Sequence, residues 1–446
     1  MQKNRLNEDH FTRIRKFRQL YPQCFLKRRD VLCSLAEALK QTPHLSSFAE
    51  LSLAPAFQHR WPSVYDIDKA EIATDKLNLL CLQQVPVRAM SFYALDVMNL
   101  RRAASETLKD RMVCHGAKRE AFGNGIVLGL PYSLLCLTEN AGSSWAPSVN
   151  CQRIRPEQKA VEVAVGQLQW LAANTEPDCT SVALDGGYGN LGFFLGLQGT
   201  EVFAAARMRN DRMLYRRPAE RGGGRGRPAK YGKPFKFSEA ETWGAAEETQ
   251  EFEDGRYGRV RLEKWSRLRL RAAEEVVEIE VVRVQIHLER EKPKRARWYG
   301  IHNGTGKPTG LGRCLETIKH RWTIEPGNRF RKDRLHAEVP RFREAESSDR
   351  WMQLGQVVEW ETYLFRESAD DQRMPWQKPL SVEQLTPGRV LKSLAANLGE
   401  VGEFSPEVRP RGKSKGWEKG RVRRRPERHQ IKLKGKKKPR VVEKVE

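Results

Sequence analysis

The spacing of hydrophobic and polar positions divides the chain into segments with different periods. In residues 1–85, apolar side chains recur at helical spacing in DVLCSLAEALKQ and DKLNLLCL, and prolines at positions 43, 55 and 62 interrupt the pattern. We therefore expect an N-terminal helical module over 1–85. Its helices are candidates for reading DNA, for dimer contacts or for core packing, and no helix-turn-helix signature decides among these uses.

From about residue 86 the pattern changes to short apolar runs typical of strands, alternating with helical segments. The predicted strands are VRAMSFYALDVM, GIVLGLPYSLLCLT, TSVALD and EVFAAARM, and the predicted helices are PEQKAVEVAVGQLQWLAAN and NLGFFLGL. This order predicts an α/β domain with a mixed sheet. We assign residues 86–210 to its first part and residues 301–400, which include a helical run from about 311 to 365, to its second part.

Residues 211–300 interrupt this domain with a different texture. The stretch RRPAERGGGRGRPAKYGKPFK, within residues 210–240, is rich in Gly, Pro and Arg, which predicts a mobile basic loop. It is followed by alternating segments that predict strands, GRVRLEKWSRLRLR, VEIEVVRVQIHLER and ARWYGIHN. We therefore expect a basic loop and a β-rich insertion over 211–300.

The C-terminal segment 401–446 is strongly basic. From Arg409 to Glu446 it holds 17 Lys and Arg against four Glu, so it supplies 13 of the 24 net positive charges of the chain. Such a block is typical of a disordered, solvated arm, and phosphate binding is its expected use. The whole chain, with 80 basic and 56 acidic residues, points to a polyanionic partner, although charge alone leaves RNA and membrane surfaces open.

Other classes of protein are disfavoured by what the 446 residues lack. The eight cysteines include no CxxC pair and the nine histidines no HExxH motif, which counts against a zinc enzyme and indicates free thiols in a reducing compartment. The N-terminus has no apolar signal region, and the most apolar window, Ile126 to Leu137, is shorter than the roughly 20 residues of a membrane helix. We expect a cytoplasmic or nucleoid-associated protein.

Three acids carry the candidate chemistry. Asp96 ends the apolar run SFYALD and Asp185 ends TSVALD, so both are expected where a strand leaves the sheet, the edge at which ligands of α/β proteins gather. In RWTIEPGNRFRKDRL, the residues Arg321, Glu325 and Lys332 fall on one helical face. Carboxylates that converge repel one another unless a cation lies between them, and they are the ligands that Mg²⁺ prefers.

Each of these signals has a structural alternative. An acid at the end of a strand is often a turn or helix-cap residue. The spacing of Arg321, Glu325 and Lys332 also suits a surface ladder of salt bridges.

The same residues carry a resemblance to a known family. The segments YALD and DGGYG, followed by Arg, three residues, Glu, six residues and Lys, resemble the motifs of the DDE transposases of bacterial insertion sequences, in particular those with a β-strand insertion between the second and third acids. Further matches extend the resemblance over residues 86 to about 435, in DRMVCHG, GLPYS, SSWAPSV, RMRNDRMLYRRP, GRPAKYGKPF, DRWMQL and PRGKSKG.

The chain departs from the family pattern in two places near the third acid. Ile318 occupies the position of the family's tyrosine. Pro326 and Gly327 follow Glu325 and disfavour a continuous helix, so we expect one helix to end near Ile324 and another to begin with Pro326.

The resemblance implies a ribonuclease-H-like catalytic domain in which Asp96, Asp185 and Glu325 hold two Mg²⁺ ions, for which Mn²⁺ can substitute. It implies that Arg321 and Lys332 bind phosphates beside the cut. Trp265 and Trp298, both in predicted strands of the insertion, are candidates for stacking on a base flipped from the DNA, with core packing as the alternative.

The activity implied by the resemblance is DNA transposition in a bacterial cell. Double-stranded DNA, as element ends and as target, would be the substrate, and a homodimer would hold two ends together. Two other interpretations stay open: a non-catalytic nucleic-acid-binding protein derived from a transposase, and a ribonuclease-H-like nuclease without strand transfer.

Overall fold

The computed structural model describes residues 2–115, 125–219, 229–272, 275–292, 294–305 and 307–402, and residues 406–410, 416, 418–422 and 425–433 of the tail. Its strands are β1 (Phe25–Lys27), β2 (Glu71–Ile72), β3 (Ser91–Arg101), β4 (Met112–His115), β5 (Ile126–Leu137), β6 (Ser148–Arg153), β7 (Thr180–Leu184), β8 (Phe203–Met208), β9 (Met213–Tyr215), β10 (Pro234–Lys236), β11 (Glu248–Asp254), β12 (Gly258–Leu270), β13 (Val277–Gln285) and β14 (Arg297–Asn303). Its α-helices are α1 (Gln2–Leu20), α2 (Arg29–Gln41), α3 (Thr74–Leu82), α4 (Ala160–Ala173), α5 (Leu191–Gly196), α6 (Leu311–His320), α7 (Ile324–Asp333), α8 (Ala345–Phe365) and α9 (Pro387–Ala396). Short 3₁₀ turns are η1 (Tyr21–Cys24), η2 (Phe48–Leu53), η3 (Trp61–Lys69), η4 (Pro177–Cys179), η5 (Ala240–Thr242), η6 (Arg321–Thr323), η7 (Arg366–Ser368) and η8 (Val382–Gln384).

A mixed sheet of 12 strands forms the body of the protein, in the order β10-β9-β12-β13-β14-β8-β7-β3-β5-β4, with β11 beside β12 and β6 beside β5. Its centre combines antiparallel pairing of β3, β5 and β6 with parallel pairing of β3, β7 and β8. Strand β7 is buried along its whole length, as expected of a parallel strand covered on both faces. The order β6-β5-β3-β7-β8 is that of a ribonuclease-H-like domain, so the predicted fold class is confirmed.

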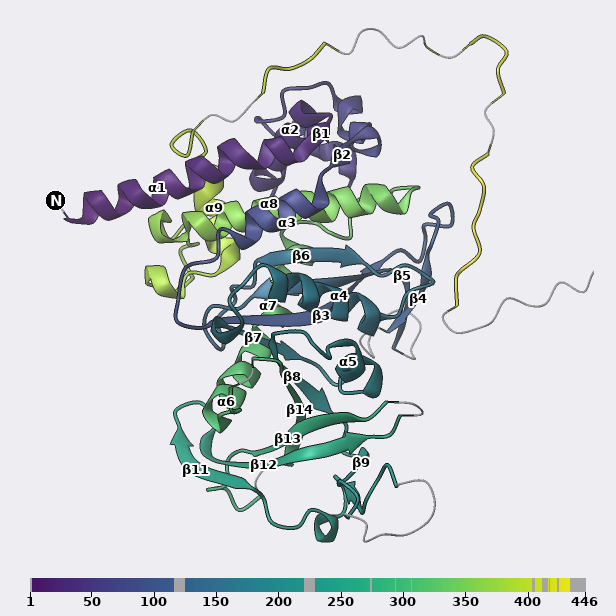
Figure 1. Ribbon diagram of the computed structural model, residues 1–446. Helices are drawn as coiled ribbons and strands as arrows, with labels where there is room; N and C mark the ends of the chain where they lie inside the picture. Colours follow the sequence, from purple (N-terminus) through teal and green to yellow (C-terminus); the bar gives the residue numbers. More distant parts are fainter. Residues whose placement is uncertain are drawn as a thin grey trace, which may run out of the picture.

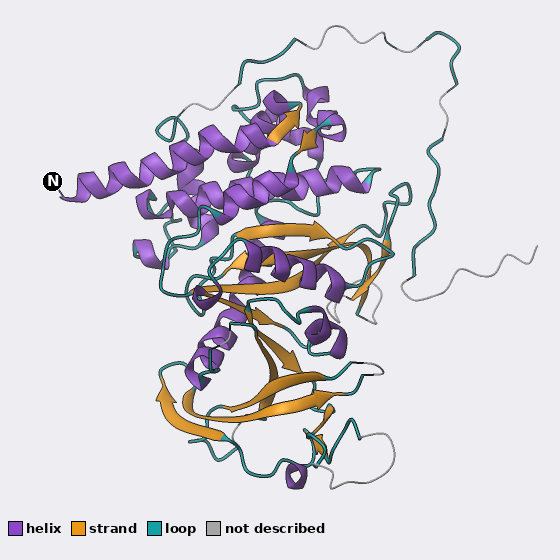
Figure 2. Ribbon diagram, in the orientation of Figure 1, coloured by secondary structure: helices purple, strands orange, loops and turns teal. Residues whose placement is uncertain are grey.

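The β-rich insertion extends the same sheet. Strands β12 and β13 form an antiparallel pair, and β13 joins the central strands through β14, which pairs with β8 (Figure 2). Helix α6 returns across this part of the sheet, and Leu311, Cys314 and Leu315 pack into its core. Within the predicted basic loop of residues 210–240, β9 and β10 pair with each other, and positions 220–228 lie outside the described residues.

Helix α8 lies between the N-terminal helices and the catalytic sheet (Figure 1). It packs against α1 and α2 on one side and against β6 on the other. On the first side its Glu361 carboxylate is completely buried and contacts Arg18 of α1 and Lys40 of α2. The acid two residues earlier in the helix, Glu359, turns to the sheet side and binds Arg331 of α7. Two acids within one turn of α8 thus pair with opposite neighbours. Apolar residues of the N-terminal helices, of α8 and of the central sheet also form one continuous hydrophobic core.

Across the part of the chain that the structure describes, no helix combines the length and the apolar composition needed to cross a membrane.

Candidate active site

The parallel pairing of β3 and β7 brings the first two acids together. The last pair of the ladder is Leu95 with Leu184, and the next residues along the two strands are Asp96 and Asp185. Strand β7 ends at Leu184, as predicted, but β3 continues to Arg101, so the prediction that Asp96 ends its strand is wrong. The physical reason is that β3 is a central strand, and its other edge remains hydrogen-bonded to β5 after β7 has ended.

Local hydrogen bonds fix the orientation of both aspartates. The backbone N–H of Val97 donates to Asp96 Oδ1 at 2.8 Å, and the N–H of Gly187 donates to Asp185 Oδ1 at 2.8 Å. One oxygen of each carboxylate is thereby held by its own strand end or turn. The second oxygen, Oδ2, is the one that faces Arg321 of the turn η6.

The third acid, Glu325, lies in the first turn of α7. The sequence predicted a helix end near Ile324 and a new helix beginning with Pro326, whereas the irregular turn is η6, at Arg321–Thr323, and α7 already begins at Ile324. Pro326 is tolerated as the third residue of α7 because N–H groups in the first turn have no partner within the helix. The prediction of a helix junction is confirmed, but it lies a few residues earlier than expected.

Gly327 explains how this helix approaches the sheet. A Cβ atom built on Gly327 would lie 2.8 Å from the Cβ of Ala146, closer than real side-chain carbons come. The glycine therefore lets α7 pack tightly against the segment before β6, and this packing sets the position of Glu325.

Arg321 lies among the three acids and contacts each of them. Its Nη2 atom is 3.4 Å from Asp96 Oδ2 and 3.9 Å from Asp185 Oδ2, and its Nη1 atom is 2.9 Å from Glu325 Oε1. Residues separated by more than 200 positions along the chain thus converge on one guanidinium group. The structure brings together the three acids that the sequence singled out.

Burial and the charges of the neighbouring groups together shift the pKa values of Asp96 and Arg321. Burial raises the pKa of Asp96 to about 6; the positive charge of Arg321 lowers it, and the neighbouring carboxylate of Asp185 raises it. For Arg321, burial alone lowers the pKa, but the carboxylates, Asp96 first, outweigh this and raise it overall. Three carboxylates around one guanidinium leave a formal charge of −2 when all are ionised.

Comparison with known proteins identifies the family. Residues 20–271, more than half of the chain, match the model of the family described as DDE superfamily endonuclease. The chain belongs to the DDE superfamily endonucleases. The matched region includes Asp96 and Asp185 and ends before Glu325. Membership of this family implies that the substrate is DNA. No match was found among curated proteins.

Members of this superfamily use divalent metal ions, and the donor set present here has the right chemistry for them. Carboxylate oxygens are the ligands that Mg²⁺ prefers, and a positively charged group already lies among the three carboxylates. Among the described residues, no three His, Cys, Asp or Glu side chains are placed to share one metal ion. A metal ion shared by all three acids would take the place that the guanidinium of Arg321 occupies.

Lys332, the last residue of the DDE motif, lies elsewhere. Its Nζ atom is 3.3 Å from the carboxylate of Glu338, which also accepts hydrogen bonds from Arg101 at the end of β3. The structure thus places Arg321 at the acids and Lys332 at the far end of β3. Ile318, in the position of the family's tyrosine, packs against the core of the insertion.

The two tryptophans predicted to contact DNA are buried in the insertion. Trp265 and Trp298 are each only 2% exposed and pack in an aromatic cluster with Phe235, Phe237 and Trp243. In this arrangement the two rings pack in a core, which is the alternative role expected from the sequence. Base stacking by either ring stays a prediction that requires the cluster to open.

A different aromatic residue is exposed at the site. Trp322, next to Arg321, is 45% exposed, and the guanidinium of Arg256 lies 5.8 Å from its ring centre. His320, on the other side of Arg321, stacks on Phe92 of β3 at 4.2 Å, and burial lowers its pKa to about 4. Neither residue was predicted from the sequence, although their positions beside Arg321 in HRWTIE are the signal that could have identified them.

Proposed function

We propose that this DDE endonuclease is a transposase that cuts DNA at the ends of an insertion sequence and joins them to target DNA by magnesium-dependent phosphoryl transfer. The observation that carries the proposal is the convergence of Asp96, Asp185 and Glu325 on the guanidinium of Arg321. A structural salt bridge does not need three acids around one cation. Three acids are needed in a site where divalent ions and a phosphate replace that cation.

Each residue of the site has a separate proposed role. The backbone N–H groups of Val97 and Gly187 hold one oxygen of each aspartate and leave the other oxygen directed at the cluster. Glu325, whose side chain is 53% exposed, completes the ligand set from the solvent side. Asp96, Asp185 and Glu325 would hold the Mg²⁺ ions, which would activate the attacking hydroxyl and stabilise the leaving oxygen of a phosphodiester.

Arg321 is proposed to exchange the carboxylates for a DNA phosphate. A guanidinium binds phosphate oxygens in a planar fork, and the neighbouring exposed ring of Trp322 offers a face to an unpaired base. Lys332 and Arg101, at the end of β3, would bind phosphates farther along the duplex. The N-terminal helices would read the terminal repeats, and a homodimer would hold two ends.

The test is incubation of the full-length protein with a DNA fragment that bears the element's own terminal repeats, with and without Mg²⁺. Cleavage at the repeat followed by joining of the labelled end to a plasmid supports the transposase. Cleavage without joining indicates a nuclease, and binding without cleavage indicates a DNA-binding protein.

Matched variants link the activity to the site. Asp185→Asn and Glu325→Gln should each reduce cleavage by at least about a hundredfold and leave DNA binding within a few-fold of the parent. Glu316→Gln removes a half-exposed acid from the neighbouring helix α6 and should cleave normally. Equal activity of Glu325→Gln and Glu316→Gln would contradict the assignment of the third acid.

A further inference from the structure

The basic C-terminal tail, expected to be a free arm, has contacts at both ends of its described part. After α9 the tail leaves the N-terminal helices, and its last described segment, in yellow, runs down beside β4 and β5 (Figure 1). The two contacts lie on different parts of the protein, so the tail spans from the N-terminal helices to the edge of the catalytic sheet.

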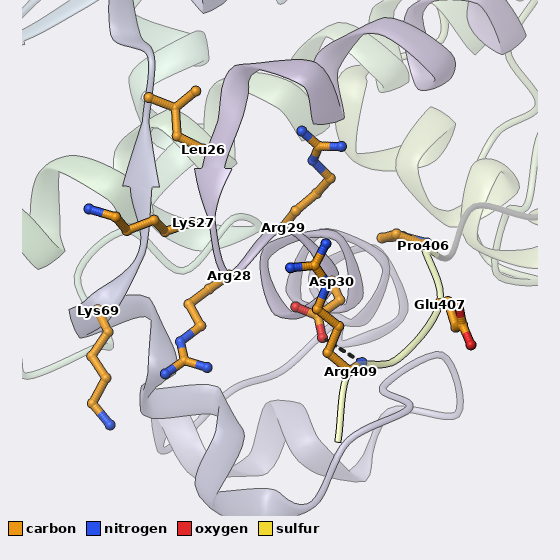
Figure 3. Close-up of a pocket in the computed structure, with 9 residues that line it drawn as sticks. All are labelled: Leu26, Lys27, Arg28, Arg29, Asp30, Lys69, Pro406, Glu407 and Arg409. Atoms are coloured by element: carbon orange, nitrogen blue, oxygen red, sulfur yellow. Dashed lines mark hydrogen bonds between the residues drawn. The ribbon is translucent and has the colours of Figure 1, made fainter. Parts of the chain in front are cut away.

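The first contact is at the start of α2. The backbone N–H of Arg409 donates to the buried carboxylate of Asp30 at 3.1 Å, beside a cavity of about 560 Å³ (Figure 3). Lys27, Arg28 and Arg29 contribute further cations to the lining of this cavity. The contact fixes where the tail begins.

The second contact is an isolated β-bridge at the edge of the sheet. The N–H of Lys432 donates to the carbonyl of Arg111 at 2.9 Å, its carbonyl accepts from the N–H of Val113 at 3.3 Å, and the residue forms a parallel bridge with Met112 of β4. Upstream, the N–H of His429 donates to the carbonyl of Glu106 at 2.9 Å. A parallel strand on an exposed edge is held by main-chain hydrogen bonds, which are independent of side-chain identity.

The surface that receives this strand is rigid. Arg102 and Arg111 are almost fully buried, and their guanidinium groups donate to backbone carbonyls of the β3–β4 loop and of residues 337 and 338. Two buried arginines thus brace the loop that connects β4 to β3. A segment that binds there is fixed relative to the strand that carries Asp96.

The position of the second contact relative to the acids suits a DNA duplex. Asp96 and Arg101 are five residues apart on β3, which corresponds to about 17 Å, or roughly five base-pair steps. The β3–β4 loop continues beyond Arg101 to the docked tail. Two exposed cations of the tail contact this loop or its end: Arg428 pairs with Glu106 at 3.2 Å, and the backbone of Lys432 bonds to Arg111 and Val113.

We infer that residues 428–432 are a β-strand anchor on β4, and that the anchor turns the basic tail into a fixed binding site for the phosphate backbone of the DNA that flanks the cut. The inference rests on the proposed function for the identity of the polyanion. The anchor itself does not, because it is defined by backbone hydrogen bonds within the chain.

The experiment compares two substitutions at one position of the full-length protein. Lys432→Gln removes the charge and keeps the N–H, whereas Lys432→Pro also removes the donor to Arg111. Without DNA, amide hydrogen exchange of Val113 should be slow in the parent and in Lys432→Gln, and at least about tenfold faster in Lys432→Pro. Ile431→Pro controls for the introduction of a proline ring, because the N–H of Ile431 points away from β4 and its loss removes no hydrogen bond to that strand.

The DNA arm uses a duplex of the element end, titrated at several salt concentrations. Lys432→Gln should lower the salt slope by about one and weaken binding modestly. Lys432→Pro should weaken binding by about a further tenfold, because an unanchored tail loses its effective concentration at the duplex. Replacing the DNA with free polyphosphate should not reproduce the difference between the two variants.

The outcomes separate the anchor from the function. Equal exchange of Val113 in all variants overturns the anchor, whether or not the protein cuts DNA. Loss of exchange protection in Lys432→Pro with unchanged DNA affinity overturns the tail as a DNA site. An intact anchor in a chain that neither binds nor cuts the terminal repeats refutes the proposed transposase and, with it, the DNA role of the tail.

Discussion

At the scale of single residues, Asp96 is the most informative side chain of the site. It lies in the middle of a strand, beside Asp185, and its carboxylate is largely withdrawn from water. Burial of a carboxylate disfavours its ionised form, and here this effect outweighs the attraction of Arg321 and raises the pKa to about 6. A divalent cation bound beside Asp96 would favour its ionised form.

The raised pKa of Asp96 predicts how the stability of the metal-free protein depends on pH. Between the ordinary value of 3.8 and about 6, the folded chain binds more protons than the unfolded chain, so stability falls as pH rises through this window. At pH 7, Asp96→Asn should be more stable than the parent by roughly 2–3 kcal/mol, and at pH 4 the difference should nearly vanish. Urea unfolding of both proteins between pH 4 and pH 7 measures this difference. A difference in unfolding free energy that does not change with pH would contradict the prediction.

Arg321 is predicted to stabilise the protein most when metal is absent. In Arg321→Gln the three carboxylates lose their shared cation, so the metal-free protein should lose about 1–2 kcal/mol of unfolding free energy. Added Mn²⁺ should then raise the melting temperature of Arg321→Gln more than that of the parent. Lys332→Gln is the control, because Lys332 pairs with Glu338 and not with the acids; a larger Mn²⁺ response in that variant would contradict the prediction.

At the scale of elements, the close approach of α7 to the segment before β6 decides where Glu325 lies. Gly327 and Gly312 are both helical, but a Cβ on Gly327 would meet Ala146 at 2.8 Å, whereas a Cβ on Gly312 would meet nothing within 4 Å. The two glycines therefore allow the same substitution to be compared with and without a packing conflict.

Gly312→Ala should stabilise the protein by about 0.5–1 kcal/mol, the usual gain of alanine over glycine within a helix. Gly327→Ala should destabilise it by about 1–3 kcal/mol and reduce cleavage, because α7 must shift and carries Glu325 with it. Thermal unfolding and the nicking assay measure both effects. Stabilisation by both substitutions would show that α7 has room to move without cost.

At the scale of the whole molecule, α8 joins the N-terminal helices to the catalytic sheet through buried charges. Arg18, Glu37, Lys40 and Glu361 form a network of two cations and two anions with almost no exposure to water. For Glu361, burial raises the pKa, but Lys40 and Arg18 outweigh it and lower the pKa overall. The network therefore stabilises the fold above the ordinary glutamate pKa of 4.5, and this stability is lost as pH falls below it.

Glu361→Gln should destabilise the protein by about 3–5 kcal/mol at pH 7, because Lys40 and Arg18 are left buried with an excess of positive charge. Glu367→Gln, in the turn η7 that follows α8, should change the unfolding free energy by less than about 1 kcal/mol. Chemical unfolding measures both. A small effect of Glu361→Gln would show that water reaches the network and that the two parts of the protein are joined mainly by apolar packing.

The sequence by itself determined the elements and the candidate acids, because both depend on local patterns. Apolar runs predicted β3 and β7, and the spacing of VEVAVGQLQWLAA predicted α4. The acid that ends each ALD sequence marked Asp96 and Asp185. The motif around Arg321 marked Glu325 in the same way. These signals need no knowledge of what lies opposite in the fold.

Only the tertiary structure decided which of these residues meet. The register of β3 against β7 places Asp96 beside Asp185, and the packing of Gly327 on Ala146 brings Glu325 to them. The burial of Trp265 and Trp298, the exposure of Trp322 and the docking of the tail on β4 likewise depend on contacts between distant segments. Hydrophobic periodicity reports which face of an element is buried, but strand register and close packing are set by partners far along the chain, which no local pattern contains.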